Sequence, residues 1–171
     1  MSMIHTDRLV IREWRESDAQ GLYEICLDPE LRRCGVGFYD SADDALKSIR
    51  HAIAGNGMKA IVCKSNGQLV GMIGLCDMNR YNGYKELDYA IASSYRNRGY
   101  ATEAVKAILA HSFRELDILV VAAWVRSHNE ASARVLEKCG FTFEGKLRKH
   151  ARDQSDTLCY SMLKEEWETQ E

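Results

Sequence analysis

The sequence predicts a single α/β domain spanning residues 1–171, in which a mixed β-sheet is flanked by helices. β-rich runs and amphipathic helical runs follow one another in the order β-α-α-β-β-β-α-β-α-β-β, without internal repeats or linkers. Residues 118–125 are apolar almost throughout, as expected for a strand that is buried on both faces. Residues 86–113 resemble a strand, a tight basic turn and a helix in succession, and the rest of the chain is organised around this segment.

The N-terminal part of the chain predicts one strand and two helices. Residues 6–14 form the strand, and residues 17–18 are candidate caps for the first helix. Pro29, the only proline, marks the turn that follows this helix. Residues 41–44 open the second helix, which the Gly-Asn-Gly sequence at 55–57 ends. The two helices either help to form a substrate groove or are ordinary amphipathic helices, and the sequence leaves both readings open.

Six further strands and two further helices are expected after these. The strands lie at residues 59–64, 68–76, 86–91, 118–125, 141–147 and 158–163. Ser65-Asn66-Gly67 joins the first two strands as a hairpin, and a loop with Asn79 and Tyr81 follows them. The helices lie at 101–113, where apolar residues recur at helical spacing, and at 129–139, which Gly140 closes.

The composition is that of a soluble intracellular protein. The chain has 23 basic and 25 acidic residues, so it lacks the positive charge of a general nucleic-acid binder. Its longest apolar run is far shorter than the roughly 20 residues that a membrane span needs. Charged residues near the N-terminus exclude a secretory signal. We therefore expect a cytoplasmic protein without nucleic-acid or membrane partners. A homodimer is compatible with the sequence, which leaves the oligomeric state open.

The cysteines predict neither a metal site nor a disulfide framework. They are scattered without a C-x-x-C pair, and most lie in apolar runs, where cysteine behaves as a small buried hydrophobe. Their positions are Cys26, Cys34, Cys63, Cys76, Cys139 and Cys159. The histidines form no nucleophile–base pattern, and we assign no chemistry to them.

The segment from Arg96 to Thr102 predicts an anion-binding site. The first N–H groups of a helix have no partner within the helix, and the helix dipole favours negative charge beside them. Gly99 has no Cβ, so a ligand can approach the backbone closely there. Arg96 and Arg98 add donors that suit phosphate oxygens. From these residues alone, a simple strand-to-helix turn with surface arginines is an equally good explanation.

Two motifs make the chain resemble a known family. Arg96-x-x-Gly99-x-Ala101 is similar to the pyrophosphate-binding pattern (Q/R)-x-x-G-x-(G/A) of the GNAT superfamily of acetyl-CoA-dependent N-acetyltransferases, and it fits neither the dinucleotide nor the P-loop pattern. Residues 129–141 resemble the GNAT segment N-x-x-(A/S)-x-x-x-(Y/L)-E-K-x-G-F, which packs beside the pantetheine arm. Residues 6–9 and 160–167 resemble the RimJ/RimL-like branch of ribosomal-protein N-terminal acetyltransferases.

The resemblance implies a fold, a cosubstrate and an acceptor. The fold is a mostly antiparallel sheet that is splayed at the cofactor site, and the cosubstrate is acetyl-CoA, without a metal. The residues expected to bind it are Ile91, Arg96, Asn97, Arg98, Gly99, Tyr100, Ala101, Thr102 and Asn129. The acceptor is an amine, with a protein N-terminal α-amine favoured over a small molecule such as a polyamine, amino acid or aminoglycoside. A catalytically silent acyl-CoA-binding module is the third hypothesis.

The resemblance also implies direct attack of the amine on the thioester, with two catalytic residues. Many family members place a tyrosine where this chain has Leu136, and that tyrosine protonates the leaving thiolate, so we expect Ser132 to take over this role. Glu86 is the expected base, directly or through a water, with Asp88 as its rival on the same face of the strand. The backbone N–H of Ile91 is the candidate oxyanion donor. Both carboxylates are also consistent with a solvated sheet face, Asp88 more so than Glu86.

Overall fold

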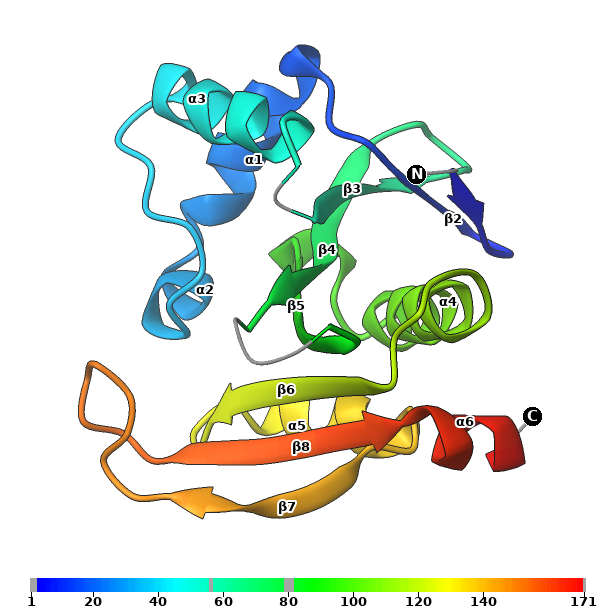
Figure 1. Ribbon diagram of the computed structural model, residues 1–171. Coiled ribbons are helices and arrows are strands. Elements are labelled where there is room, and N and C mark those ends of the chain that lie inside the picture. Colours follow the sequence, from blue (N-terminus) through cyan, green and yellow to red (C-terminus); the bar gives the residue numbers. More distant parts are fainter. Residues whose placement is uncertain (1–2, 56, 79–81, 171) are drawn as a thin grey trace. The chain divides into compact units, whose positions relative to one another are not determined.

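The computed structural model in Figure 1 describes residues 3–55, 57–78 and 82–170. The predicted loop positions Asn79 and Tyr81, and Asn56 of the predicted helix stop, lie outside the described residues. Within the described ranges, no helix is long and apolar enough to cross a membrane.

Eight strands form one sheet in the order β1-β2-β3-β4-β5-β6-β8-β7. Their bounds are β1 Ile4–His5, β2 Leu9–Arg12, β3 Met58–Cys63, β4 Leu69–Asp77, β5 Tyr84–Ile91, β6 Val120–Arg126, β7 Thr142–Leu147 and β8 Thr157–Leu163. The described pairings are antiparallel except that of β5 with β6, which is parallel and runs from Tyr84 to Glu86. The predicted mixed, mostly antiparallel sheet is therefore confirmed. The first predicted strand is shorter than expected: β2 occupies its middle, and β1, which lies before the predicted range, pairs with β2 in antiparallel fashion.

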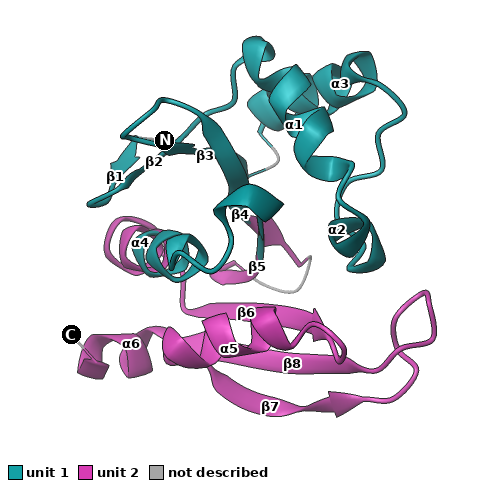
Figure 2. Cartoon of the chain, turned by 180° about the vertical axis from the view of Figure 1, so that it is seen from behind, with its two compact units in different colours: residues 1–74, 88–107 teal, residues 75–87, 108–171 magenta. Residues whose placement is uncertain are grey.

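The chain divides into two compact units, which Figure 2 shows in teal and magenta. Unit 1 comprises Met1–Gly74 and Asp88–Ala107, and unit 2 comprises Leu75–Leu87 and Ile108–Glu171. The boundaries fall within three elements, β4, β5 and α4 (Tyr100–Glu115), so each of these elements contributes residues to both units.

Unit 1 contains the N-terminal helices, which differ from the prediction at two places. They are the 3-10 turn η1 (Glu16–Asp18) and the helices α1 (Ala19–Cys26), α2 (Pro29–Arg33) and α3 (Ala42–Ile53). Asp18 does not cap α1, because its carboxylate accepts the N–H of Arg15 at the start of η1 instead. Pro29 is the first residue of α2, whose N-cap Asp28 accepts the N–H of Glu30. The predicted cap of α3 is confirmed, since the Ser41 hydroxyl accepts the N–H of Asp44.

The core of unit 1 lies between these helices and the sheet. α1 packs against α3, and both contribute to one buried cluster with residues of β3 and β4 (Figure 1). The larger members of this cluster are Trp14, Leu22, Ile25, Leu31, Ile49 and Met72. Ala60 of β3 belongs to this cluster, whereas Cys63, on the opposite face by strand alternation, contacts Tyr100 of α4. β3 is thus covered on both faces, which explains its apolar sequence.

Unit 2 contains a three-stranded part of the sheet and two short helices, α5 (Glu130–Lys138) and α6 (Lys164–Gln170). β8 lies between β6 and β7, as expected for the closing antiparallel pair. β6 buries Val121, Ala123 and Val125, in line with the predicted buried strand. Helix α6 was not predicted. It follows β8 directly, and its Trp167 ring lies 5.6 Å from the ring of Phe113.

Candidate active site

The predicted anion-binding segment forms an exposed turn in unit 1. Strand β5 ends at Ile91, a 3-10 turn η2 (Ser93–Tyr95) follows, and α4 begins at Tyr100. Residues 97–99 between them are exposed, and Asn97 and Gly99 have left-handed φ angles of 59° and 80°. Such angles suit Asn and Gly and turn successive N–H groups toward one side. The strand–turn–helix geometry that an anion site needs is therefore present.

Aromatic and guanidinium groups stack beside this turn. The guanidinium of Arg8 lies 4.7 Å from the centre of the Tyr100 ring, and that ring is stacked on Tyr95 with centroids 6.1 Å apart. Arg98 lies 5.4 Å from the centre of the Tyr95 ring. The Tyr95 hydroxyl accepts a hydrogen bond from Asn66. These side-chain contacts fix the position of the turn, and with it the position of its backbone N–H groups.

The side chain of Arg96 contacts other residues of unit 1. Its Nε donates to the carbonyl of Ile91 at 3.1 Å, and its terminal nitrogen forms an ion pair with a carboxylate oxygen of Asp28 at 2.6 Å. The Asp28 side chain is only 12% exposed. Arg96 therefore ties the turn to the end of β5 and to the start of α2. Its contact with a cofactor phosphate stays a prediction.

Strand alternation separates the carboxylates of β5 from its apolar side chains. Glu86 is half-buried and lies in register with Ala122 of β6, whereas Asp88 is exposed. Leu87, between them, is buried on the other face. The two carboxylates thus differ in exposure, and the less exposed one has the better shielded position for a base.

The second predicted motif forms the start of α5 in unit 2. The side-chain oxygen of Asn129 accepts the N–H of Ser132 at 3.1 Å, so Asn129 is the N-cap of this helix. Ser132 is half-buried in the first turn. Leu136 is fully buried in the core, so the position that carries a tyrosine in many family members serves packing here. Within α5, Ser132 remains the candidate donor for the leaving thiolate.

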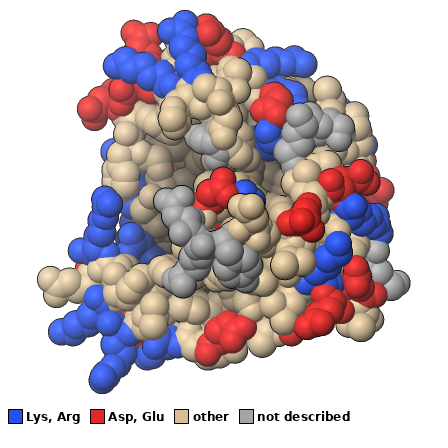
Figure 3. Space-filling view, viewed as in Figure 1, with Lys and Arg blue, Asp and Glu red and all other residues tan. Residues whose placement is uncertain are grey.

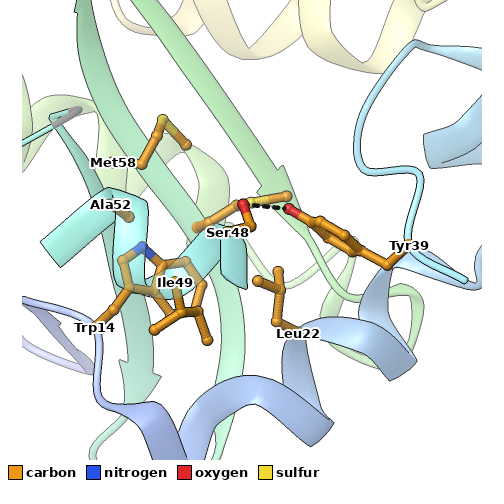
Figure 4. A pocket seen from close by; sticks show the side chains of 8 residues that line it. Trp14, Leu22, Tyr39, Ser48, Ile49, Ala52 and Met58 are labelled. Carbon is orange, nitrogen blue, oxygen red and sulfur yellow. Dashed lines mark hydrogen bonds between the residues drawn. The ribbon is translucent and has the colours of Figure 1, made fainter. Parts of the chain in front are cut away.

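A small pocket lies under the N-terminal helices of unit 1 (Figure 4). It has a volume of about 50 Å³ and is lined by Trp14, Leu22, Tyr39, Ser48, Ile49, Ala52, Met58 and Met72. The Tyr39 hydroxyl donates to the Ser48 hydroxyl at 3.0 Å inside it. Burial raises the pKa of Tyr39, and its hydrogen bond with Ser48 only partly offsets this effect. The pocket is therefore a mostly apolar space without a charged group among its lining residues.

The structure places each predicted site residue within one of the two units. Unit 1 carries Ile91 and the segment from Arg96 to Thr102, and unit 2 carries Glu86, Asn129 and Ser132. The sequence reading missed Arg8, which lies beside this segment. The available signal was its place in the Thr6–Leu9 stretch, to which a strand and a family resemblance had been assigned, but no role in the site. Over residues 3–55, 57–78 and 82–170, no cluster of three or more His, Cys, Asp and Glu side chains suits a metal ion.

Comparison with known proteins identifies the family. Residues 8–142 match the profile of the acetyltransferase (GNAT) domain. The chain belongs to the GNAT acetyltransferase family. As a member of this family it is an acetyl-CoA-dependent acetyltransferase, and the predicted enzyme class is confirmed.

Two relatives, YokL and YdaF, cover most of this chain, and a third covers about half of it. YokL of Bacillus subtilis, named as a prophage-derived N-acetyltransferase, is 33% identical over 83% of each chain. "Putative ribosomal N-acetyltransferase YdaF" of the same organism is 29% identical over 95% of this chain and 94% of its own. The spermidine N(1)-acetyltransferase of Escherichia coli is 27% identical over 52% of this chain and 48% of its own.

Solved structures agree on the fold. A GNAT-family acetyltransferase from Bacillus anthracis superimposes with a TM-score of 0.86 at 25% identity, over 96% of this chain and 99% of that one. The ribosomal L7/L12 α-N-protein acetyltransferase RimL has the same fold, with a TM-score of 0.83 at 21% identity over 95% and 94% of the two chains. The predicted resemblance to ribosomal-protein acetyltransferases of this family is thus confirmed by YdaF, and the RimL structure adds agreement in the fold.

Proposed function

We propose that this GNAT enzyme transfers the acetyl group of acetyl-CoA to the α-amine of a protein N-terminus. The observation that carries the proposal is the exposed left-handed turn at Asn97 and Gly99, at the N-terminus of α4, in a chain of this family. The name of its relative YdaF supports a ribosomal-protein acceptor.

The cofactor phosphates bind, in this proposal, to the turn that precedes α4. The backbone N–H groups of Arg98 to Thr102 supply donors, and the exposed guanidinium of Arg98 supplies positive charge. Gly99 leaves room for a phosphate because no Cβ stands on its backbone. Asn129 binds the pantetheine arm with its amide nitrogen, since its amide oxygen is used to cap α5. All of these roles follow the family resemblance.

The chemistry requires a neutral amine, a polarised carbonyl and a stabilised thiolate. Glu86 accepts the proton of the amine, directly or through a water, and the N–H of Ile91 donates to the carbonyl oxygen. Ser132 donates to the thiolate, which is a modest leaving group with a thiol pKa of about 8.5. A hydrogen bond is sufficient for such a group, so no strong acid is needed in place of the absent tyrosine.

Proton chemistry favours an α-amine as the acceptor. An α-amine with a pKa of about 7.9 is roughly one quarter neutral at pH 7.4, whereas a lysine amine with a pKa of about 10.4 is roughly 0.1% neutral. A single half-buried carboxylate therefore has to remove a proton from a smaller fraction of the acceptor when the acceptor is an α-amine. This argument supports the protein N-terminus over a lysine-like amine.

A polyamine is the second candidate acceptor. The spermidine N(1)-acetyltransferase of Escherichia coli matches about half of this chain, and its substrate is a primary amine. The amines of a polyamine are lysine-like in basicity, so this candidate demands more from the base than an α-amine does. With a polyamine as the acceptor, the rate should rise more steeply with pH than with an α-amine.

A thiol-release assay with acetyl-CoA separates the candidates. The acceptors are peptides with free N-termini, the same peptides with acetylated N-termini and an internal lysine, and spermidine. Release of CoA with the first set alone supports the proposal, and preference for spermidine would replace it with the second candidate. Tight acetyl-CoA binding without turnover on any amine would point to an acyl-CoA-binding protein instead.

A further inference from the structure

We propose that Arg8 is a positioning residue of the cofactor site, which orients the Arg98–Gly99 peptide so that the N–H of Gly99 faces the phosphate. This inference rests on the proposed function for the location of the phosphate. It adds a residue from near the N-terminus, on the loop before β2, to the segment that the family motif defines.

The contacts of Arg8 converge on the turn and on the first turn of α4. One terminal nitrogen of its guanidinium donates to the carbonyl oxygen of Arg98 at 2.8 Å. Its Nε donates to the Glu103 carboxylate at 2.7 Å, and its other terminal nitrogen lies 2.6 Å from the same carboxylate. The backbone N–H of Arg8 donates to Glu103 at 2.9 Å as well. The planar guanidinium is thereby held in one orientation, with the Tyr100 ring beneath it.

Because the peptide bond is planar, the contact of Arg8 with the carbonyl of Arg98 also sets the direction of the N–H of Gly99. The Arg98–Gly99 peptide is trans, so its C=O and N–H groups point in opposite directions. Since Arg8 binds the carbonyl oxygen, the N–H of Gly99 is turned to the side away from Arg8. With a φ of 80°, Gly99 has a backbone that flips readily between conformations unless a neighbour fixes it. The N–H of Glu103 holds the carbonyl of Gly99 at 3.0 Å, and Arg8 is the side chain that holds the peptide on its other side, between Arg98 and Gly99.

Charge neutralisation of Glu103 is a rival explanation for Arg8. The Glu103 side chain is 16% exposed, and it accepts a hydrogen bond from the Thr6 hydroxyl at 2.5 Å. Burial alone would raise its pKa, but the hydrogen bonds from Thr6 and Arg8 outweigh burial and lower the pKa. Glu103 is therefore ionised at neutral pH, and without Arg8 its charge would repel a phosphate at the same helix end. The experiment must separate orientation from neutralisation.

The first test is the affinity for CoA of the variant Arg8→Lys, measured by calorimetry. Lysine keeps the charge but has one nitrogen, so it cannot hold both Arg98 and Glu103 in the fork geometry. The expected dissociation constant is about ten-fold higher than that of the parent, as for loss of one charge-assisted hydrogen bond. The matched control is Arg50→Lys, because Arg50 makes a similar two-nitrogen contact with Glu16 at the surface of unit 1. It should bind CoA as the parent does.

Two further measurements distinguish orientation from other roles. In protein labelled with ¹⁵N-glycine, CoA should shift the Gly99 amide signal strongly in the parent and clearly less in Arg8→Lys, while Gly67 stays unchanged in both. The double variant Arg8→Ala/Glu103→Gln removes both charges, and its affinity should stay as low as that of Arg8→Ala. Restored affinity in the double variant would show that neutralisation explains Arg8 and would overturn the proposal.

The outcomes also separate this inference from the proposed function. If the parent binds CoA and Arg8→Lys binds it equally well, Arg8 has no positioning role, although the cofactor site stands. If CoA leaves the Gly99 signal of the parent unchanged while it binds tightly, the phosphate lies elsewhere and the placement of the cofactor site is wrong.

Discussion

At the scale of single residues, the proposed chemistry depends on where ordinary side chains are placed. Glu86 lies in the middle of a strand, half-buried, and Ser132 lies in the first turn of a capped helix. Each of these positions has a plain structural use as well. A carboxylate can line a solvated sheet face, and a serine is common in a first helical turn. Substitutions that preserve shape and remove one chemical property can therefore distinguish catalysis from structure.

Replacement of Ser132 by alanine should lower turnover and leave acetyl-CoA affinity nearly unchanged. The hydroxyl is proposed to bind charge that develops on sulfur only as the thioester breaks, so its loss raises the barrier without weakening the ground-state complex. A hydrogen bond to a charged group is worth about 1.5–3 kcal/mol, which corresponds to a roughly ten- to hundred-fold fall in kcat. Steady-state kinetics and a calorimetric titration measure the two quantities.

The control for Ser132→Ala is Ser127→Ala, at an exposed position of the same unit. Alanine is a good helix former, so a purely structural Ser132 predicts full activity for its alanine variant too. A donor with a more acidic leaving thiol should rescue Ser132→Ala in part, because its thiolate needs less stabilisation. Equal losses with both donors would exclude the thiolate role.

Replacement of Glu86 by glutamine should reduce kcat more at pH 7 than at pH 9. Free amine is scarce at the lower pH, so a base matters most there, and the effect should be larger for a lysine-like amine than for an α-amine. The pH–rate profiles of the parent and the variant measure this difference. Glu130→Gln, at an exposed residue that pairs with Arg134, is the control. Identical profiles for parent and Glu86→Gln would move the role to Asp88, with Asp88→Asn as the next variant.

At the scale of elements, the sequence predicted the helices whose apolar spacing and end residues are visible within one short stretch of sequence. The helix after Gly99 was expected from its apolar spacing, and Val105, Ile108, Leu109 and Phe113 are indeed buried. The motif of α5 was expected from Asn129 and Gly140, and Asn129 caps the helix. Short elements were missed: α2 has five residues and α6 has seven, too few for a periodic signal. Proline suited the first position of α2 as well as a turn.

The candidate site was predictable only where a contiguous motif describes it. The segment from Arg96 to Thr102 is a single stretch of sequence, and its turn geometry follows from Gly99 and the helix that starts behind it. Arg8 is far away in the chain, and its contact with Arg98 depends on how β2, β3 and α4 pack in unit 1. Arg96 was expected at a phosphate, but its partners Asp28 and Ile91 come from tertiary packing. No local pattern contains such information.

The ion pair between Arg12 and Asp18 joins β2 to the start of the N-terminal helices and should make unit 1 sensitive to acid. Two guanidinium nitrogens donate to the two carboxylate oxygens at 2.8 and 2.9 Å, and both side chains are nearly buried, at 12% and 10% exposure. Burial would raise the pKa of Asp18, but the hydrogen bonds from Arg12 and Arg15 outweigh it, so the pKa is lowered. The stabilisation by Asp18 is therefore full above the unfolded-state pKa of about 3.9 and is lost as the pH falls through the folded-state value.

Asp18→Asn should lower the free energy of unfolding by about 3 kcal/mol at pH 7, because it leaves a nearly buried guanidinium without its partner. The difference from the parent should shrink as the pH falls below about 4, since the parent then loses the same ion pair. Urea unfolding at a series of pH values measures both effects. Glu16→Gln, which breaks the exposed pair with Arg50, should leave the unfolding midpoint nearly unchanged. A constant difference between Asp18→Asn and the parent down to pH 2 would contradict the assignment.

At the scale of the whole molecule, charge gives little general attraction for an anionic cofactor. The formal net charge is −2, and the face in Figure 3 carries Lys and Arg interspersed with Asp and Glu, with basic side chains gathered toward the β7–β8 connection of unit 2. Long-range steering by such a surface is weak at physiological salt. The affinity for acetyl-CoA must therefore come from local donors. Substitutions at the turn before α4 should therefore change the affinity for acetyl-CoA.

Acetyl-CoA should raise the melting temperature of the protein, and substitution of Gly99 should abolish this rise. A ligand at one hundred times its dissociation constant stabilises the native state by about 2.7 kcal/mol, which corresponds to roughly 5–10 °C for a chain of this length. In Gly99→Val the side chain would press on the Arg8 guanidinium, which lies 3.3 Å from the position of a Cβ, and would displace the Arg98–Gly99 peptide with its donors, so little of this shift should remain. Differential scanning fluorimetry with and without acetyl-CoA measures the shift for each variant.

The comparison must correct for the strain that any side chain suffers at a left-handed residue. Gly67 also has a left-handed φ, 69°, and a Cβ there would meet nothing within 4 Å. At Gly99 the nearest atom is a guanidinium nitrogen of Arg8 at 3.3 Å. Both Gly67→Ala and Gly99→Ala add the cost of a left-handed alanine, about 1–2 kcal/mol, and Gly99→Ala adds the close contact with Arg8, so it should lower the melting temperature of the free protein at least as much as Gly67→Ala does. Only Gly99→Ala should also reduce the shift produced by acetyl-CoA. If Gly99→Ala and Gly99→Val both keep the full shift, the phosphates of the cofactor do not bind at this turn.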